Sequence, residues 1–387
     1  MSQIETIKNK KDILDNSELD FYNKVSNFPI YCGCTTQKKE LDLFMDMNFG
    51  ISKSTGIIQI IEYPTDEFIY INGPHNSAIG KTWDGLFDLL SEEMNFYSDE
   101  TTNLYEIGAG SGQILKKFLK ISNDKFNKYV CYEPNPLKSL ENLIDSSAKT
   151  ELYKKYLADE TFSEPCVIIH SHLLEHLSDP LNFIKSISNS LSKSKKNIQI
   201  FAVPNLKIHF EKKYSNTICW EHKYYLNENY IENILQINNQ EIVKKQYYLD
   251  HSIIYVTKSK NYYGKELSIT NFYDTNIKLL ESYFNYYLNY VKKLNELILT
   301  DQNPIYIFGA HVWSQNLICF GLNTKKIINI LDNDKKKQNK RLYGTDLIVV
   351  DPKVIENKEC TVILNNSAYY EEIKQQLFNL SNKIKIC

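Results

Sequence analysis

The spacing of apolar residues predicts alternating strands and helices through the middle of the chain. Short apolar runs that are typical of buried strands lie at 103–107, 129–132, 166–169 and 198–203. Apolar residues recur every three or four positions, as in helices, at 113–120, 137–144 and 181–191. Because strands that alternate with helices form parallel sheets, this region predicts a doubly wound α/β sheet. The runs at 240–248 and 252–257 predict an antiparallel pair that closes this sheet.

Different patterns lie on both sides of this region. Residues 1–30 are mostly polar and predict a partly helical lead, whereas the runs at 57–61 and 68–71 predict strands of a small mixed domain. Helices are predicted at 80–97 and, with a stripe of Tyr and Leu, at 266–300. A second α/β unit follows, with strands at 305–308, 327–331, 347–350 and 361–364 and a helix that ends at Phe320. We therefore divide the chain into a small N-terminal domain (1–97), a central domain (98–262), a linking helix (263–300) and a C-terminal Rossmann-like domain (301–387).

Length and composition narrow the class of protein. A chain of 387 residues is long enough for two or three domains. Its net charge of −2 gives no basic excess that would favour a nucleic-acid partner. The polar N-terminus lacks the apolar core of a signal peptide, and no stretch approaches the roughly 18 apolar residues of a membrane span, so we expect a cytoplasmic protein. The eight cysteines form no C-x2-C pair, which predicts reduced thiols.

Three of the 13 glycines fall in one turn. Gly108, Gly110 and Gly112 follow the first strand of the central sheet and open the next helix, in an E-x-G-x-G-x-G pattern that begins with Glu106. Glycines allow a tight turn and a close approach of the backbone to a ligand. The spacing differs from the G-x-G-x-x-G of dinucleotide sites. Glu133 follows the next strand, where a carboxylate is suited to the two hydroxyls of a ribose.

The turn and the second carboxylate together resemble class I S-adenosylmethionine-dependent methyltransferases. The resemblance implies S-adenosylmethionine as the cofactor, with Glu106 and the glycines holding its methionine part and Glu133 its ribose. An ordinary tight turn with a surface acid is the alternative interpretation. The residues that we assign to the cofactor are Glu106, Gly108, Ala109, Gly110, Gly112, Glu133, Pro134 and His170.

Two later segments concentrate titratable side chains. His172 and His176 follow the fourth strand, four residues apart, and share one face if the segment is helical. Glu221 and His222 follow the fifth strand and lie close to Tyr225. Histidine is the natural general base near neutral pH, and methyl transfer from a sulfonium needs a positioned nucleophile that loses its proton. We therefore take these five residues as candidate catalytic groups, with capping and packing as the alternative for the first pair.

Metal ligation is a second interpretation of the His172–His176 pair. Zinc proteases carry H-E-x-x-H, whereas here Glu175 directly precedes the second histidine, so we expect no catalytic metal. Cys32 and Cys34 form a close pair, but no second pair follows that would complete a zinc site.

The histidine segments extend the resemblance to a narrower group. From about residue 30 to 387 the chain resembles three-domain methyltransferases that act on nucleotide-linked deoxysugars, whose best-known members are C-methyltransferases. That family has Asn-x-x-x-His-x-x-Asp-Pro where this chain has His172 in place of the Asn. It has Thr-Ile-Tyr-His-Glu-His where this chain has Cys219 in place of the Tyr. The resemblance implies Glu221 and His222 as the catalytic pair, with His222 as the base.

The departures from the family pattern affect the expected reaction. C-methylation needs a keto sugar whose enolate is held by donors, and two of the family's contacts are changed here. We therefore expect O-methylation of a nucleotide-activated sugar, in surface polysaccharide or glycoconjugate assembly. C-methylation of an NDP-4-keto-deoxysugar is the alternative. A non-catalytic module that binds sugar nucleotides, and an oxidoreductase with a dinucleotide in the C-terminal domain, are further alternatives.

Two other segments are candidates for the acceptor pocket. Residues Tyr70 to Ser77 predict a loop that either lines this pocket or serves as a structural turn. In the C-terminal domain, Gly309 follows a strand as in half of a dinucleotide fingerprint. Because only one glycine is present, this pattern favours a platform for the nucleotide end of the substrate over a second cofactor site. His311 and Trp313 would offer a donor and a stacking face there, or pack between domains.

Overall fold

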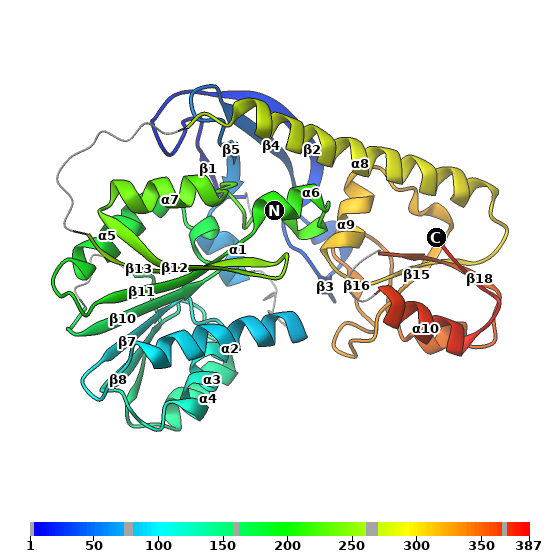
Figure 1. Cartoon of the computed structure of the whole chain (residues 1–387). Helices are drawn as coiled ribbons and strands as arrows, with labels where there is room; N and C mark the ends of the chain where they lie inside the picture. Colours follow the sequence, from blue (N-terminus) through cyan, green and yellow to red (C-terminus); the bar gives the residue numbers. More distant parts are fainter. Residues whose placement is uncertain (1–3, 73–79, 158–161, 261–269, 366–369) are drawn as a thin grey trace.

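A mixed sheet of seven strands forms the centre of the molecule (Figure 1). The computed structural model describes residues 4–72, 80–157, 162–260, 270–365 and 370–387. The strand order is β12-β13-β11-β10-β7-β8-β9, and all neighbours are parallel except β13, which is antiparallel to both of its own. The predicted doubly wound sheet with an antiparallel closing pair is confirmed. Its strands are β7 (Asn103–Ile107), β8 (Lys128–Tyr132), β9 (Thr150–Tyr153), β10 (Cys166–Ser171), β11 (Ile198–Pro204), β12 (Gln240–Tyr248) and β13 (Ser252–Ser259).

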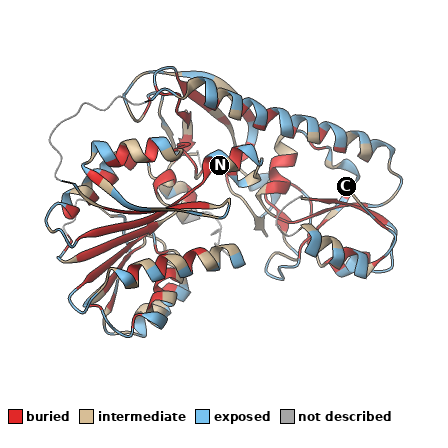
Figure 2. Cartoon of the chain, viewed as in Figure 1, coloured by how far each residue is buried: buried red, intermediate tan, exposed pale blue. Residues whose placement is uncertain are grey.

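Helices cover both faces of this sheet (Figure 1). One face carries α2 (Lys81–Phe96), α3 (Gln113–Ile121) and α4 (Lys138–Asp145), and the other carries α5 (Pro180–Leu191) and α7 (Glu228–Ile237). The inner strands are therefore buried from both sides, as Figure 2 shows, which explains why they are mostly apolar in the sequence, whereas the edge strands β12 and β9 are partly exposed. Helix α2, which we grouped with the N-terminal domain, packs on the central sheet through Leu86, Leu90 and Met94.

The N-terminal region forms small antiparallel sheets, so the predicted helical lead at 1–30 is wrong. β2 is buried only at Val25, Phe28 and Pro29. Its remaining residues are mostly polar and reach solvent, which hides the strand signal in the sequence. The strands of this region are β2 (Leu19–Pro29), β4 (Phe44–Ser52) and β5 (Ile58–Ile60), which pair in this order, and β1 (Thr6–Lys8) with β6 (Glu62–Pro64).

The apolar run at 68–71 is also helical, which corrects the prediction of a strand. It lies in α1 (Asp66–Asn72). The hydroxyl oxygen of Thr65 accepts a hydrogen bond from the backbone N–H of Phe68 (3.3 Å), and two acidic residues occupy the first turn, where they stabilise a helix. A run of four apolar residues does not by itself separate helix from strand. The loop predicted from Tyr70 to Ser77 is therefore wrong at its first three residues, which belong to α1, and the rest of it lies outside the described residues.

A long helix, α8 (Tyr273–Thr300), leads from the N-terminal sheet to a C-terminal α/β domain (Figure 1). The sheet of this domain is parallel, with the order β17-β15-β14-β18-β19. The predicted long helix and second α/β unit are confirmed, whereas the last helix and strand are additions that we did not predict. The elements are β14 (Ile305–Phe308), α9 (Val312–Cys319), β15 (Ile327–Leu331), β17 (Val349–Val350), β18 (Cys360–Leu364), α10 (Tyr370–Leu380) and β19 (Ile384–Ile386).

One apolar core joins the N-terminal sheet, α8 and the C-terminal domain. Within it Phe49 of β4 lies edge-on to Phe284 of α8, with ring centroids 5.6 Å apart. The core also takes in Trp220, from the segment between β11 and α7, and the Trp220 indole N–H donates to the carbonyl of Pro29 (3.1 Å). Burial of such large rings stabilises by about 1.5–3 kcal/mol each. The two flanking regions are therefore packed together as one body.

Polar contacts reinforce this packing between the N-terminal and C-terminal regions. Both guanidinium NH groups of Arg341 donate to the carboxylate of Asp42 at 2.5 Å, and the Asp42 side chain has no solvent exposure. The side chain of Gln315 in α9 donates to the carbonyls of Tyr31 and Tyr343, at 3.0 Å each, and accepts from the N–H of Gly33 (3.0 Å). The short strands β3 (Cys34–Thr35) and β16 (Arg341–Leu342) pair beside these contacts.

The turn before β5 predicts a sensitive position, because Gly56 has a φ of +78° and lies against the start of α8. A Cβ atom at Gly56 would lie 2.2 Å from the backbone nitrogen of Tyr273. Gly56→Ala should therefore lose about 1–2 kcal/mol to the left-handed backbone and about 1–3 kcal/mol more to the clash. Gly321→Ala is the matched control, because Gly321 has a φ of +100° and open space around its Cβ position. Urea unfolding measures both changes, and equal losses would contradict the proposed clash.

Candidate active site

The glycine turn lies between β7 and α3, at the carboxyl edge of the central sheet. Gly108, Gly110 and Gly112 all have positive φ, at 76°, 53° and 76°. A Cβ atom at Gly110 would meet nothing within 4 Å, whereas one at Gly112 would crowd Leu140 of α4. Gly112 is thus required for packing, and Gly110 leaves backbone open to the space above the sheet.

Glu133, directly after β8, is bonded to this turn. Its carboxylate accepts hydrogen bonds from the backbone N–H groups of Gly110 (2.8 Å) and Asn135 (3.0 Å). The two loops that follow β7 and β8 are therefore joined through one carboxylate. Pro134 and Ala109 line the same space.

Glu106 occupies a drier position within β7. It is 2% exposed, and its carboxylate accepts a hydrogen bond from the hydroxyl of Tyr129 (2.6 Å). Burial raises the pKa of Glu106 to about 8, although the Tyr129 hydrogen bond lowers it. A cationic group that reached this carboxylate from the cavity would stabilise its charged form.

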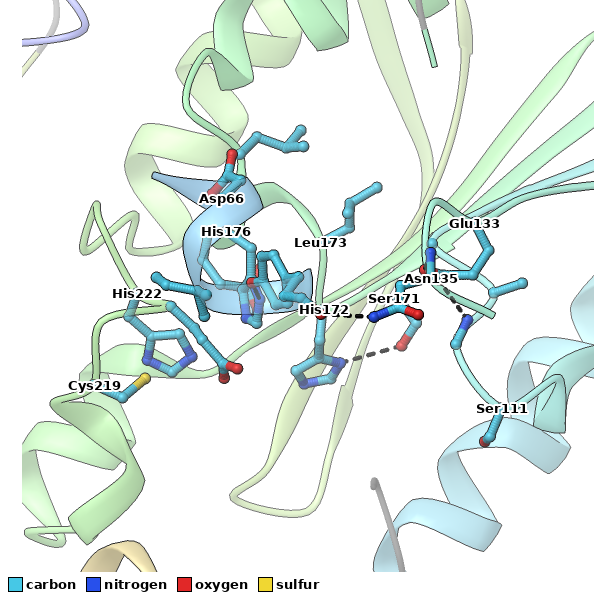
Figure 3. A pocket seen from close by; sticks show the side chains of 18 of the residues that line it. Asp66, Ser111, Glu133, Asn135, Ser171, His172, Leu173, His176, Cys219 and His222 are labelled. Carbon is cyan, nitrogen blue, oxygen red and sulfur yellow. Dashed lines mark hydrogen bonds and ion pairs between the residues drawn. The ribbon is translucent and has the colours of Figure 1, made fainter. Parts of the chain in front are cut away.

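A cavity of about 660 Å³ opens along the carboxyl edge of the sheet, and three parts of the chain line it. Tyr31, Cys32 and Tyr70 line it from the N-terminal region, and His311 and Lys337 line it from the C-terminal domain. The central domain supplies the loops after its parallel strands, where ligands of open α/β sheets bind. In Figure 3, Glu133, Asn135 and Ser111 lie on one side of the cavity and His176, His222 and Cys219 on the other, with His172 between them.

His172 lies at the middle of the cavity in a left-handed conformation, with a φ of 48°. Its ring contacts the Ser171 hydroxyl (3.1 Å), the Ser252 hydroxyl (3.1 Å) and the ring of Trp83, whose centroid is 4.6 Å away. Burial lowers the pKa of His172 well below its ordinary value, and the nearby His251 ring lowers it further. His172 is therefore a neutral ring held by hydroxyl groups.

His176 and His222 face each other on the other side, with ring centroids 5.4 Å apart. The Nδ1–H of His222 has the carbonyl of Thr217 as its acceptor (3.1 Å), and Nδ1 of His176 shares a hydrogen bond with the hydroxyl of Tyr70 (2.8 Å). Both rings are thus fixed through Nδ1 and leave Nε2 for the cavity. Burial lowers the pKa of His176 well below its ordinary value.

Glu175 lies beside these two histidines and is 2% exposed. Neither of its carboxylate oxygens has a hydrogen-bond partner among the described residues. Burial raises the pKa of Glu175 to about 7, although His222 lowers it. Burial also raises the pKa of Glu221, which lines the same wall.

The loop that carries Glu221 and His222 is held by the N-terminal sheet. The backbone N–H of Ile60 donates to the carbonyl of Lys223 (2.9 Å), and that of Tyr225 donates to the carbonyl of Ile58 (3.0 Å). The fully buried Lys223 side chain pairs with Asp66 at the start of α1 and donates to the carbonyl of His176. One lysine therefore fixes the relative positions of both histidine segments and α1.

Three predicted site residues lie away from the cavity lining. His170 is fully buried inside the sheet, stacked on Phe201, and burial lowers its pKa to about 3. Tyr225 belongs to the apolar core, and its hydroxyl has no partner among the described residues. Gly112 packs against α4, as described above.

The C-terminal domain places one of its two predicted residues at the cavity. His311 lines it, and Nδ1 of His311 accepts the backbone N–H of Trp313 (3.2 Å), which leaves the proton on Nε2. Lys337 joins it there and pairs with Asp332 at 3.2 Å. Trp313 is buried in the apolar core.

Sequence reasoning missed several residues of the site. Glu175 and Lys223 lie within the two histidine segments, but contacts between distant parts of the chain determine their surroundings. Glu175 is buried without a hydrogen-bond partner among the described residues, and Lys223 is buried and paired with Asp66. Trp83 and His209 lie in helices and His251 in the turn between β12 and β13, and no local pattern signals that they line the cavity.

Comparison with known proteins gives structural similarities only. No family model and no curated protein matches this chain. Among solved structures, it is similar to N,N-8-amino-8-demethyl-D-riboflavin dimethyltransferase from Streptomyces davawensis, with 13% identity, a TM-score of 0.37 and coverage of 45% of this chain and 55% of that one. It is also similar to an S-adenosylmethionine-dependent methyltransferase from Clostridium acetobutylicum, with 13% identity and a TM-score of 0.35. That match covers 48% of this chain and 94% of that one.

An O-methyltransferase family protein from Burkholderia thailandensis is similar with 11% identity and a TM-score of 0.36. That match covers 46% of this chain and 56% of that one. The matched region thus spans about half the length of the first and third proteins. Similarity at this level assigns no activity. Separately, no helix among the described residues is both long and apolar enough to cross a membrane.

The raised pKa of Glu106 predicts a pH-dependent stability. An unfolded glutamate titrates near 4.5, whereas Glu106 in the folded chain titrates at about 8. The folded state therefore holds this proton more tightly, and the stability that the proton provides is lost as the pH rises from about 5 to about 8. In the absence of ligand, Glu106→Gln should unfold at a higher temperature than the wild type. The shift should be about 2–4 °C for each kcal/mol gained in the free energy of unfolding, and it should grow as the pH rises through this window. Thermal unfolding at a series of pH values tests this, with Glu141→Gln as control, because Glu141 is half-buried in α4 and paired with Lys138 and Lys154. A difference that does not change with pH would contradict it.

Proposed function

We propose that this chain is an S-adenosylmethionine-dependent methyltransferase that acts on a hydroxyl group of a nucleotide-activated sugar. The observation that carries the proposal is the carboxylate of Glu133 on the N–H of Gly110, at the edge of a cavity whose other end holds His222. A donor site and an acid–base site would therefore share one cavity.

The residues at the donor end suit the proposed cofactor. Glu133 has two carboxylate oxygens at the end of β8, where they can accept hydrogen bonds from both ribose hydroxyls. The open backbone at Gly110 allows a ligand to approach closely. Glu106 offers a buried carboxylate for the ammonium group of the methionine part. When bound, this cofactor would supply an electrophilic methyl group.

The residues at the acceptor end suit activation of a hydroxyl. Because Nδ1 of His222 is held by the Thr217 carbonyl, the lone pair of Nε2 is available to accept the proton of an acceptor hydroxyl. Glu221 stands beside it and would stabilise the imidazolium that results. Both residues line the cavity, and their burial strengthens the electrostatic interaction between them.

The C-terminal wall supports the substrate class. Lys337 and the Nε2–H of His311 line the cavity and offer a cation and a donor, which suit the phosphates of a nucleotide-linked sugar. A sugar held between this wall and His222 would direct one hydroxyl toward the donor end. The methylated sugar would then serve the assembly of a surface polysaccharide or glycoconjugate.

Removal of the Glu133 carboxylate should weaken cofactor binding. Each hydrogen bond to a charged acceptor contributes about 1.5–3 kcal/mol, so Glu133→Ala should raise the Kd for S-adenosylmethionine by roughly ten-fold or more. Calorimetry measures this change. Glu141→Ala is the matched control, because Glu141 is an acidic residue of α4 that pairs with Lys138 and Lys154 at the surface. An unchanged Kd for Glu133→Ala would remove this residue from the cofactor site.

Replacement of His222 by asparagine should separate catalysis from binding. The amide N–H of Asn can replace the Nδ1–H donor to Thr217, but Asn accepts no proton at this pH. His222→Asn should therefore lower methyl transfer by roughly 100-fold or more while the Kd for S-adenosylmethionine stays unchanged. The assay uses labelled cofactor with a panel of nucleotide sugars, and mass spectrometry locates the methyl group. Wild-type turnover would exclude His222 as the base, and a methyl group on carbon would replace O-methylation with C-methylation.

A further inference from the structure

A group of potential metal ligands lies at the acceptor end of the cavity. Glu175, His176 and His222 each offer one ligand atom, and these atoms all lie within 4.8 Å of one another. Two imidazole nitrogens and one carboxylate oxygen form a common ligand set for zinc and similar divalent ions. The sequence pattern disfavoured a metal because Glu175 directly precedes His176, unlike in H-E-x-x-H. The third ligand, His222, lies 46 residues after His176 and is brought to them by the fold.

The Glu175 carboxylate gives the first independent reason to expect a cation here. It is 2% exposed, and both of its oxygens lack a hydrogen-bond partner among the described residues. A buried carboxylate without donors is costly, and a bound cation would remove this cost. The nearest ring nitrogen, Nε2 of His176, is 3.7 Å from Oε1 of Glu175, which is too long for a hydrogen bond. It is close to the roughly 3.4 Å that separates two ligand atoms on one tetrahedral zinc ion.

The two histidine rings give the second reason. Nδ1 of His222 is held by the Thr217 carbonyl, and Nδ1 of His176 by the Tyr70 hydroxyl. Metal-binding histidines almost always have their other nitrogen held in this way, which fixes the ring and its tautomer. Both Nε2 atoms are left for a ligand in the cavity. The nearby Lys223 cation is neutralised by Asp66.

We propose that Glu175, His176 and His222 bind one divalent ion of the zinc type, with the remaining coordination positions open to the cavity. The binding site stands on these contacts alone, whereas its role in catalysis rests on the proposed function. An acceptor hydroxyl at an open position would lose its proton more readily. In the metal-loaded protein His222 would be a ligand, and Glu221 on the same wall would receive this proton.

Metal binding to the full chain, stripped with a chelator and dialysed, tests the proposal without any activity assay. Calorimetry with Zn²⁺ and absorption with Co²⁺ should both show one site, and bound Co²⁺ should give the visible bands of a low-coordinate ion. Glu175→Gln and His176→Ala should weaken Zn²⁺ binding by more than 100-fold, and Tyr70→Phe by about 10–100-fold through loss of the contact that holds His176. His251→Ala is the matched control, because His251 lines the same cavity outside the cluster and should leave Zn²⁺ affinity unchanged.

The outcomes separate the metal site from the methyltransferase proposal. Absence of a stoichiometric site in the wild type, or wild-type Zn²⁺ affinity in Glu175→Gln, would overturn the metal site even if the chain methylates a sugar. A site that is lost in Glu175→Gln and kept in His251→Ala would support it. The Kd for S-adenosylmethionine, measured on the same Glu175→Gln protein, should equal that of the wild type. Metal binding with no affinity for S-adenosylmethionine in the wild type would leave the metal site standing and overturn the proposed function.

Discussion

Burial of titratable side chains at the carboxyl edge of the central sheet is the constraint on which the rest of the site depends. The apolar core that joins the N-terminal sheet, α8 and the C-terminal domain holds two regions over this edge. Glu106 is buried within β7 and Glu175 lies beneath the covering regions, and the pKa of each rises into the neutral range. Without the covering regions Glu175 would be an ordinary surface acid. Packing far from the cavity therefore sets the chemistry inside it.

The two ends of the cavity are built in different ways. At the glycine turn, backbone conformation does the work, because Gly110 opens space and Glu133 closes the turn with a hydrogen bond. At the other end, contacts from other regions hold the site in place. The Tyr70 hydroxyl holds the ring of His176, and the N–H of Ile60 holds the carbonyl of Lys223. The first end is a local property of one βα unit. The second exists only in the assembled chain.

This difference explains what the sequence could predict. The central strands and the glycine turn follow from local patterns, and β7 has the predicted bounds of Asn103–Ile107. β2 was missed because most of its residues reach solvent. His170 and His172 look equivalent in sequence, yet one is buried within a strand and the other follows it in a left-handed conformation that turns its ring into the cavity. The importance of Glu175 depends on which groups surround it after folding, and spacing along the chain does not carry this information.

Because the cavity takes its walls from three regions, its two ends can vary independently. Residues such as Tyr31 and Lys337 contact the space from loops outside the central sheet. Substitutions there would reshape this part of the cavity while leaving the glycine turn and Glu133 in place. Under the proposed function, such changes would alter the preference for the acceptor around an unchanged cofactor site. The N-terminal and C-terminal regions would then be where the specificity for the acceptor is decided.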